Sequence, residues 1–177
     1  MKFTLTDEIP YPRPLVFQTH RDALLELKAY MPNVADVVVE ERHEEGDVVR
    51  LLNRWTGASG DVPAVLRPVI RPEMLSWLDR ATWDAGRWRT EWEITLLALP
   101  DAVTARGINV FRDDGDVTQI QMTGEFLLHP ERIRGVPTFV ARQAAPAIEK
   151  FVVGLLEPNL RKSNAAVRQY LDDRQNS

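Results

Sequence analysis

The feature that most constrains the fold is a long apolar pattern near the C-terminal end of the chain. Between Pro146 and Asp173, apolar residues recur at steps of three and four, as on one face of an α-helix. They are Ile148, Phe151, Val152, Leu155, Leu156, Leu160, Val167, Tyr170 and Leu171. At ~1.5 Å per residue this helix would reach roughly 40 Å, which is longer than a small domain's core. We therefore predict that it lies across a whole sheet.

The chain before this helix is dominated by strand patterns. Turn sequences rich in Gly and Asp separate them, which is typical of one antiparallel sheet. The predicted strands are Lys2–Ile9, Val34–His43, Val48–Thr56, Met74–Asp84, Trp88–Leu99, Val103–Phe111 and Val117–Leu128. Two short helices, Leu15–His20 and Asp22–Tyr30, should follow the first strand, and Pro137–Ala145 should form another short helix before the long one. We expect at most a short irregular helix over Val62–Ile70.

Length and composition limit the class of protein. With 177 residues, the chain fits one domain spanning residues 1–177. A net charge of -4 gives no basic field for nucleic acid, and the absence of cysteine excludes disulfides and thiolate metal sites. The N-terminal residues lack a signal-peptide pattern, and no stretch reaches the ~18 apolar residues that a membrane span needs. These observations predict a cytoplasmic protein without an integral membrane segment.

Tryptophan is the most informative residue type for a binding site. Four of the five tryptophans fall between Trp77 and Trp92, on two strands that should pair across a turn. Each indole could simply fill the core, where it would bury ~150 to 250 Å². Together they favour an aromatic-lined pocket, because packing against one helix would more naturally use branched aliphatic side chains. The candidate lining residues are Trp55, Trp77, Trp83, Trp88, Trp92, Met122, Phe126, Phe151 and Leu155.

Asp79 is the candidate polar anchor in this pocket. It alternates in phase with Trp77 and Trp83, and a carboxyl group on an apolar face must be paired, protonated or chemically active. A bulge that turns Asp79 outward beside Arg80 is the alternative. Asn53, in phase with Trp55, could add a neutral hydrogen bond, although an ordinary exposed strand position is the simpler explanation.

Other kinds of site find little support in the sequence. His20, His43 and His129 are far apart, and the acidic run around His43 is explained by a solvated hairpin tip, so we predict no metal site. There is no nucleophile triad, phosphate loop or dinucleotide fingerprint, and we expect no cofactor and no catalytic residue beyond the possibility of Asp79. Gly154 and Pro158, four apart, predict a kink in the long helix.

The order of elements resembles a known family over essentially the whole chain. Local matches are Lys2–Phe3, Pro63–Ile70, Ala81–Asp84, Gly107, Gly124 and Pro146–Ile148. The chain is similar to bacterial members of the SRPBCC superfamily, which includes START lipid-transfer domains, plant pathogenesis-related allergens and polyketide cyclases. The resemblance implies an α+β helix-grip fold, in which a seven-stranded curved antiparallel sheet wraps around the long C-terminal helix. It also implies an apolar cavity, but no settled activity.

We therefore expect the chain to bind or transport a hydrophobic or amphipathic small molecule, such as a lipid, between the sheet and the last helix. A non-enzymatic role is favoured. The first alternative is a polyketide cyclase or dehydratase-like enzyme with Asp79 as acid or base. The second is a protein-interaction module that uses the outer sheet face or Val62–Ile70. Transient membrane contact and the oligomeric state stay open at this point.

Overall fold

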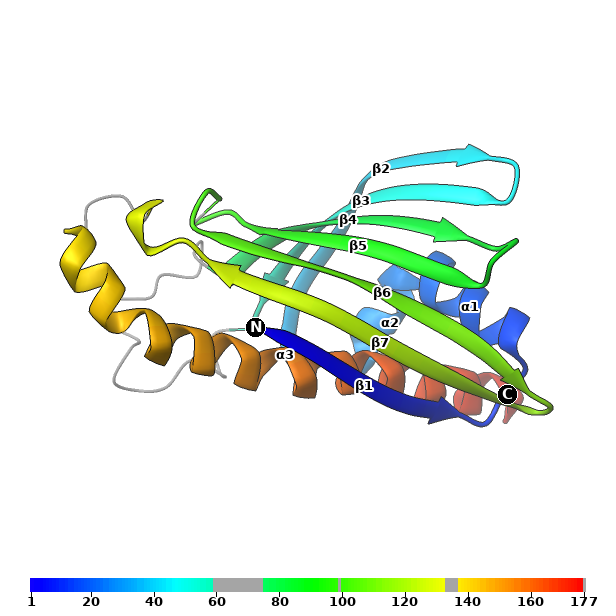
Figure 1. Ribbon diagram of the computed structural model, residues 1–177. Helices are drawn as coiled ribbons and strands as arrows, with labels where there is room; N and C mark the ends of the chain where they lie inside the picture. Colours follow the sequence, from blue (N-terminus) through cyan, green and yellow to red (C-terminus); the bar gives the residue numbers. More distant parts are fainter. Residues whose placement is uncertain (59–74, 99, 133–136, 177) are drawn as a thin grey trace.

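The computed structural model describes residues 1–58, 75–98, 100–132 and 137–176. Within them, seven strands form one curved antiparallel sheet with the order β1-β7-β6-β5-β4-β3-β2, so β1 and β2 are its edges (Figure 1). The strands are β1 (Lys2–Ile9), β2 (Val34–Glu45), β3 (Val48–Gly57), β4 (Ser76–Asp84), β5 (Arg89–Leu96), β6 (Val103–Asp114) and β7 (Val117–Leu128). The predicted α+β fold with its seven-stranded sheet is confirmed.

Two short helical segments follow β1, as predicted. They are α1 (Arg13–Asp22), which starts with a proline in its first turn, and α2 (Leu24–Leu27), which continues as the 3-10 turn η1 (Lys28–Tyr30). A second 3-10 turn, η4 (Pro130–Arg132), follows β7. The predicted segment Val62–Ile70 lies outside the described residues.

The C-terminal helix is longer than the sequence pattern indicated. The single helix α3 (Thr138–Gln175) includes the stretch Pro137–Ala145 that we expected to be a separate short helix. That expectation is corrected: a proline removes one backbone donor, and the helix here continues past Pro146 and past Pro158. In Figure 1 the gold first part of α3 turns away from the direction of its orange and red remainder.

The helices cover one face of the sheet, which we call the inner face (Figure 1). Val16 and Phe17 of α1 and Val167 of α3 are fully buried there. Hydrogen bonds fix the last turns of α3 to the N-terminal segment: Tyr11 Oη donates to Asp172 Oδ1 over 2.7 Å, and Tyr30 Oη donates to Asp173 Oδ2 over 2.8 Å. The core therefore centres on the end of the sheet where α1 and the C-terminal end of α3 meet.

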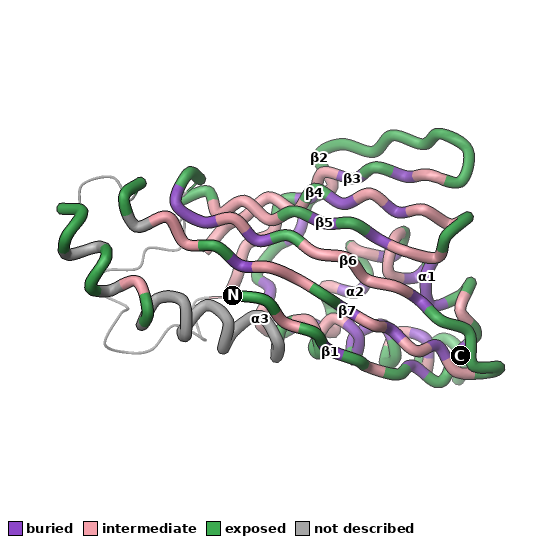
Figure 2. The backbone as a smooth tube through the Cα atoms, in the orientation of Figure 1, coloured by how far each residue is buried: buried purple, intermediate pink, exposed green. Residues whose placement is uncertain are grey.

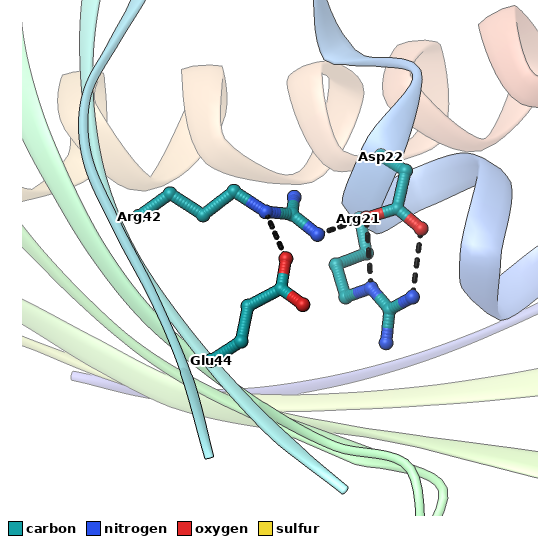
Figure 3. Close-up of polar contacts among 4 residues, drawn as sticks. All are labelled: Arg21, Asp22, Arg42 and Glu44. Carbon is teal, nitrogen blue, oxygen red and sulfur yellow. Dashed lines mark hydrogen bonds and ion pairs between the residues drawn. The ribbon is translucent and has the colours of Figure 1, made fainter. Parts of the chain in front are cut away.

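The β2–β3 hairpin is tied to α1 by charged side chains. Along its projecting part β2 is exposed, drawn in green in Figure 2. Arg42 of β2 donates from Nη2 to Asp22 Oδ1 over 2.9 Å and from Nε to Glu44 Oε1 over 2.6 Å, while Arg21 donates to both oxygens of Asp22 (Figure 3). Burial opposes ionisation of Asp22, but the hydrogen bonds from the two arginines outweigh it and lower the pKa of this carboxyl. Among the described residues, one ion pair, Arg42–Asp22, thus joins the hairpin to α1, and Glu44 and Arg21 hold its two partners in place.

Candidate functional site

Strand β4 carries the candidate anchor on its inner face. Ala81 and Trp83 are 3% and 8% exposed and belong to the core, which places the odd-numbered residues of β4 toward the helices. Asp79 shares this face, because side chains two residues apart on a strand point to the same side. Arg80, its neighbour, is exposed on the other face. The alternation in the sequence thus predicted the direction of Asp79, and no bulge interrupts the pairing of β4 with β3 or β5.

Asp79 accepts two hydrogen bonds from β3. Asn53 lies directly opposite it, and the amide Nδ2 of Asn53 donates to Asp79 Oδ2 over 3.3 Å. The side chain of Trp55 donates a second hydrogen bond. Loss of hydration by burial raises the pKa of Asp79 to about 6, and these two hydrogen bonds only partly oppose that rise. Within the described residues no ion pair joins Asp79 to a basic side chain.

The Asp79 carboxyl is desolvated by the surrounding protein but is not sealed off from solvent. Asp79 is surrounded by protein closely enough to disfavour its charged form, and yet the residue is only partly shielded from solvent. Asn53 beside it is 2% exposed, and its Oδ1 has no hydrogen-bond partner among the described residues. This corner of the inner face therefore holds an acid and an amide whose hydrogen-bonding capacity is not fully used.

Two stacked tryptophans adjoin this polar pair. Trp55 on β3 lies directly opposite Trp77 on β4, with ring centroids 6.1 Å apart and ring planes at 1° to each other. Both indoles are half-buried. On β5, Ile94 lies opposite Asp79 and Leu96 lies opposite Trp77, and these two aliphatic side chains are half-buried as well. We call Asn53, Trp55, Trp77 and Asp79 the Asp79 end of the inner face.

The next pair of tryptophans belongs to a different environment. Phe17 of α1 meets Trp83, Trp88 and Phe111 edge-on, at centroid distances of 5.2, 5.4 and 5.1 Å. Trp88, just before β5, has a positive φ of 51°, and the Arg13 guanidinium lies 4.5 Å from the centroid of its ring. We call Phe17, Trp83, Trp88 and Phe111 the Phe17 end of the inner face. Its rings pack on each other and on α1.

The fifth tryptophan lies between the two ends. Trp92 is 8% exposed, its Nε1 donates to Asn109 Oδ1 over 3.0 Å, and its ring stacks on Phe3 at 6.5 Å. Phe3, Gly124, Gly107 and Trp92 are direct neighbours in one row across four strands. A Cβ at Gly107 would come within 2.3 Å of Trp92, so the glycines make room for the two rings to lie on the sheet.

The remaining candidates from the sequence are not brought to the Asp79 end by described contacts. Met122 and Phe126 of β7 are each 1% exposed and lie within the core, and the side chains of Phe151 and Leu155 are outside the described part of the structure. Across the described residues, no group of three or more His, Asp or Glu side chains could hold a metal ion. His43 is exposed on the hairpin and faces Glu41.

Two contributors were not singled out from the sequence, and a third, Asn53, was singled out without its partner. Ile94 and Leu96 alternate with Trp92 on the same face, which was a usable signal. Asn53 alternates with Trp55 in the same way, but only the register between β3 and β4 shows that it faces Asp79. The sequence between these strands contains a long connection, so no hairpin rule fixed that register.

Comparison with known proteins shows the fold. No protein-family model matches the sequence, and none of the curated proteins does. The crystal structure of Zhui aromatase/cyclase from Streptomyces sp. R1128 has a TM-score of 0.64 at 17% identity, covering 98% of this chain and 94% of that one. Norcoclaurine synthase from Thalictrum flavum has a TM-score of 0.60 at 13% identity, with coverage of 97% and 86%. Ara h 8.0201 has a TM-score of 0.61 at 11% identity, with 98% of each chain covered.

The chain has the helix-grip fold. Because these identities lie between 11% and 17%, the likeness shows the shared fold alone. In the part of the chain that the structure describes, no helix combines the length and apolar character needed to cross a membrane.

Proposed function

We propose that this chain binds a hydrophobic or amphipathic small molecule between the inner face of the sheet and α3, at the Asp79 end. The observation that carries the proposal is the combination of half-buried indoles with a carboxyl group of raised pKa on the same inward face. Ligand sites typically pair an apolar lining with a few polar groups that orient the ligand. The shared fold supports the proposal, because solved structures with it include an aromatase/cyclase and norcoclaurine synthase.

Burial along the inner face supports this location over the Phe17 end. Trp55, Trp77, Ile94 and Leu96 are all half-buried although they point toward the helix side of the sheet. By contrast, Phe17 is 0% exposed. A ligand would gain apolar contact at the Asp79 end without displacing packed side chains.

A neutral apolar dye tests the proposal directly. Nile red should bind the purified protein with increased emission, and Trp77→Ala should weaken that binding at least several-fold. Trp83→Phe is the matched control, since Trp83 lies on the same face of the same strand but at the Phe17 end. Native mass spectrometry of the freshly purified protein should also detect a co-purified small molecule. Absence of dye uptake by the wild-type protein, with a crystal structure showing side chains filling the space under α3, would overturn the proposal.

A second candidate is an enzyme that uses Asp79 as an acid or base. It is favoured by one observation: a carboxyl with a pKa of about 6 has both protonation states populated near neutral pH. Among the described residues, no second titratable side chain is hydrogen-bonded to Asp79, so binding without conversion ranks first. Mass spectrometry of a bound ligand after incubation separates the two. An altered mass that Asp79→Asn abolishes would favour the enzyme.

A further inference from the structure

The Asp79 end has more hydrogen-bond acceptors than donors. Two of its three donor groups, the Asn53 amide nitrogen and the Trp55 side chain, already point to the Asp79 carboxyl, and the third is the indole N–H of Trp77. The acceptors are not used up: a carboxylate has about four lone-pair positions, and Asn53 Oδ1 is buried without a donor. Leaving a buried acceptor unpaired costs free energy, so the structure favours a ligand that supplies N–H or O–H groups.

The negative charge of an ionised Asp79 has no positive partner nearby among the described residues. Ile94 from β5 and Asn53 from β3 are the direct neighbours of Asp79 across the sheet, and neither carries charge. The exposed Arg80 lies on the opposite face of β4. Within the described residues, then, no titratable side chain on the adjoining strands compensates an ionised Asp79. A ligand cation would supply that charge, whereas a ligand carboxylate would add a second negative charge.

The aromatic pair adds the third element. Trp55 and Trp77 are half-buried, and their ring planes are parallel within 1°. Indole faces attract both flat aromatic rings and cations. A carboxylate, an acceptor amide and two indoles on neighbouring strands therefore match a ligand that has a flat apolar body and a protonated amino group.

We propose that the ligand class of this site is an aromatic or otherwise apolar organic amine, whose ammonium group donates to Asp79 beside Asn53, and that the site rejects carboxylic acids. This inference rests on the proposed function, because it assigns a chemical class to the molecule bound at the Asp79 end. It excludes fatty acids as the preferred ligand at neutral pH.

Three probes of one shape test the inference: naphthylmethylamine, naphthylmethanol and naphthoic acid. At about pH 8, isothermal titration calorimetry should show the amine binding at least about tenfold tighter than the acid, with the alcohol between them. Asp79→Asn should remove most of the preference for the amine. Glu93→Gln is the control, because it also removes one negative charge, from an exposed residue on the neighbouring strand. This variant should still bind the amine more tightly than the acid.

Acidification provides a second readout that a merely structural Asp79 would not produce. Because about one Asp79 in eleven is ionised at about pH 5, the affinity for the amine should fall about tenfold from its value at about pH 8. In Asp79→Asn this pH dependence should disappear.

The possible outcomes separate the inference from the proposed function. Binding of the alcohol without any preference for the amine, or a preference for the acid, would overturn the amine class and leave small-molecule binding intact. An amine preference that survives in Asp79→Asn would also overturn it. If none of the three probes binds at millimolar concentration and Nile red fails too, both proposals fall.

Discussion

At one end of the inner sheet face, Phe17 reaches from α1 into three aromatic rings. Phe17, Trp83 and Phe111 are at most 8% exposed there, and Trp88 is half-buried under the guanidinium of Arg13. At the other end, Trp55 and Trp77 stack on each other and stay half-buried beside a carboxyl group. Both ends carry tryptophans, and Trp77 and Trp83 even lie on the same face of the same strand, β4. The difference lies in what packs above them, so tryptophan content alone does not distinguish a core from a binding surface.

Each end also contains one titratable group whose neutral form is favoured. At the Phe17 end, burial lowers the pKa of His20 to about 4, and its ring stacks on Trp83 at a centroid distance of 6.3 Å. At the Asp79 end, burial raises the pKa of the carboxyl to about 6. The same physical cause, loss of hydration, thus shifts a base and an acid in opposite directions.

The largest expected effect is on stability at the Phe17 end. Phe17→Ala should cost about 3 to 5 kcal/mol, because it removes a fully buried ring and leaves a cavity. Against a typical total of about 5 to 15 kcal/mol, this loss should be evident in urea unfolding. Leu96→Ala at the other end should cost clearly less, since that side chain is half-buried. Equal losses at both ends would contradict the distinction drawn between them.

The next effect is a pair of opposite pH dependences. In the unfolded chain His20 takes up a proton near pH 6.5, but in the fold only near pH 4, so it lowers stability as the pH falls between these values. Asp79 takes up a proton near pH 6 in the fold but only near 3.8 when unfolded, so it raises stability as the pH falls through that window. Each contribution is up to about 3 kcal/mol, at about 1.4 kcal/mol per pH unit, and the two largely cancel.

Two variants should uncover these opposing contributions. His20→Gln should become more stable on acidification from about pH 7.5 to about 4.5, and Asp79→Asn should become less stable. At neutral pH, Asp79→Asn should match or exceed the wild-type stability, because an uncompensated buried carboxylate is removed. Urea unfolding of the three proteins at several pH values measures this. Variants that both retain the wild-type pH profile would show that neither side chain is desolvated in the fold.

A smaller effect should appear when a ligand binds. With Nile red or naphthylmethylamine at about ten times its dissociation constant, amide hydrogen exchange should slow up to about tenfold near Asn53–Trp55 and Trp77–Asp79. Amides of Phe17–His20 that exchange by local opening should not change. Equal slowing at both ends would instead indicate that the ligand stabilises the fold as a whole.

The smallest effect concerns the charged contacts of the hairpin shown in Figure 3. Arg42→Gln should cost at most about 1 kcal/mol, because these side chains are largely exposed, and the loss should shrink at high salt. Arg50→Gln is the control, since Arg50 pairs with Glu45 inside the hairpin and not with α1. Stability measured at low and high salt compares the two variants. A large, salt-independent loss in Arg42→Gln would mean that packing of its side chain, not charge, holds the hairpin.

Sequence reasoning was strongest where a side chain's direction depends only on its own strand. Alternation put Asp79 in phase with Trp77 and Trp83 but left open a bulge that would turn it outward, and the uninterrupted pairing of β4 decides for the inner face. It could not place Asn53 against Asp79, because pairing register depends on two strands. The β2–β3 pair also contains two register shifts, one of them between Val39 and Glu41. The alternation of apolar and polar residues does not predict such shifts.

The sequence also could not predict which tryptophans belong to the packed core and which stay half-buried. The sequence shows that Trp83 and Trp77 share a face, but only the position of α1 decides that Phe17 covers the first. Likewise, Pro146 reads as a helix start, because a proline is tolerated there most easily. In the structure it lies inside α3, where it removes one backbone donor without ending the helix.

The row Phe3, Gly124, Gly107 and Trp92 has a consequence for how this sequence can evolve. A Cβ at Gly124 would meet mainly the ring of Phe3, at 2.4 Å, so an alanine there becomes acceptable once residue 3 is small. A Cβ at Gly107 would meet the backbone oxygen of Thr123 at 2.3 Å as well as Trp92, and no single compensating side-chain change relieves that contact. Among related sequences, positions 3 and 124 should therefore covary in size, whereas position 107 should remain glycine even where position 92 varies.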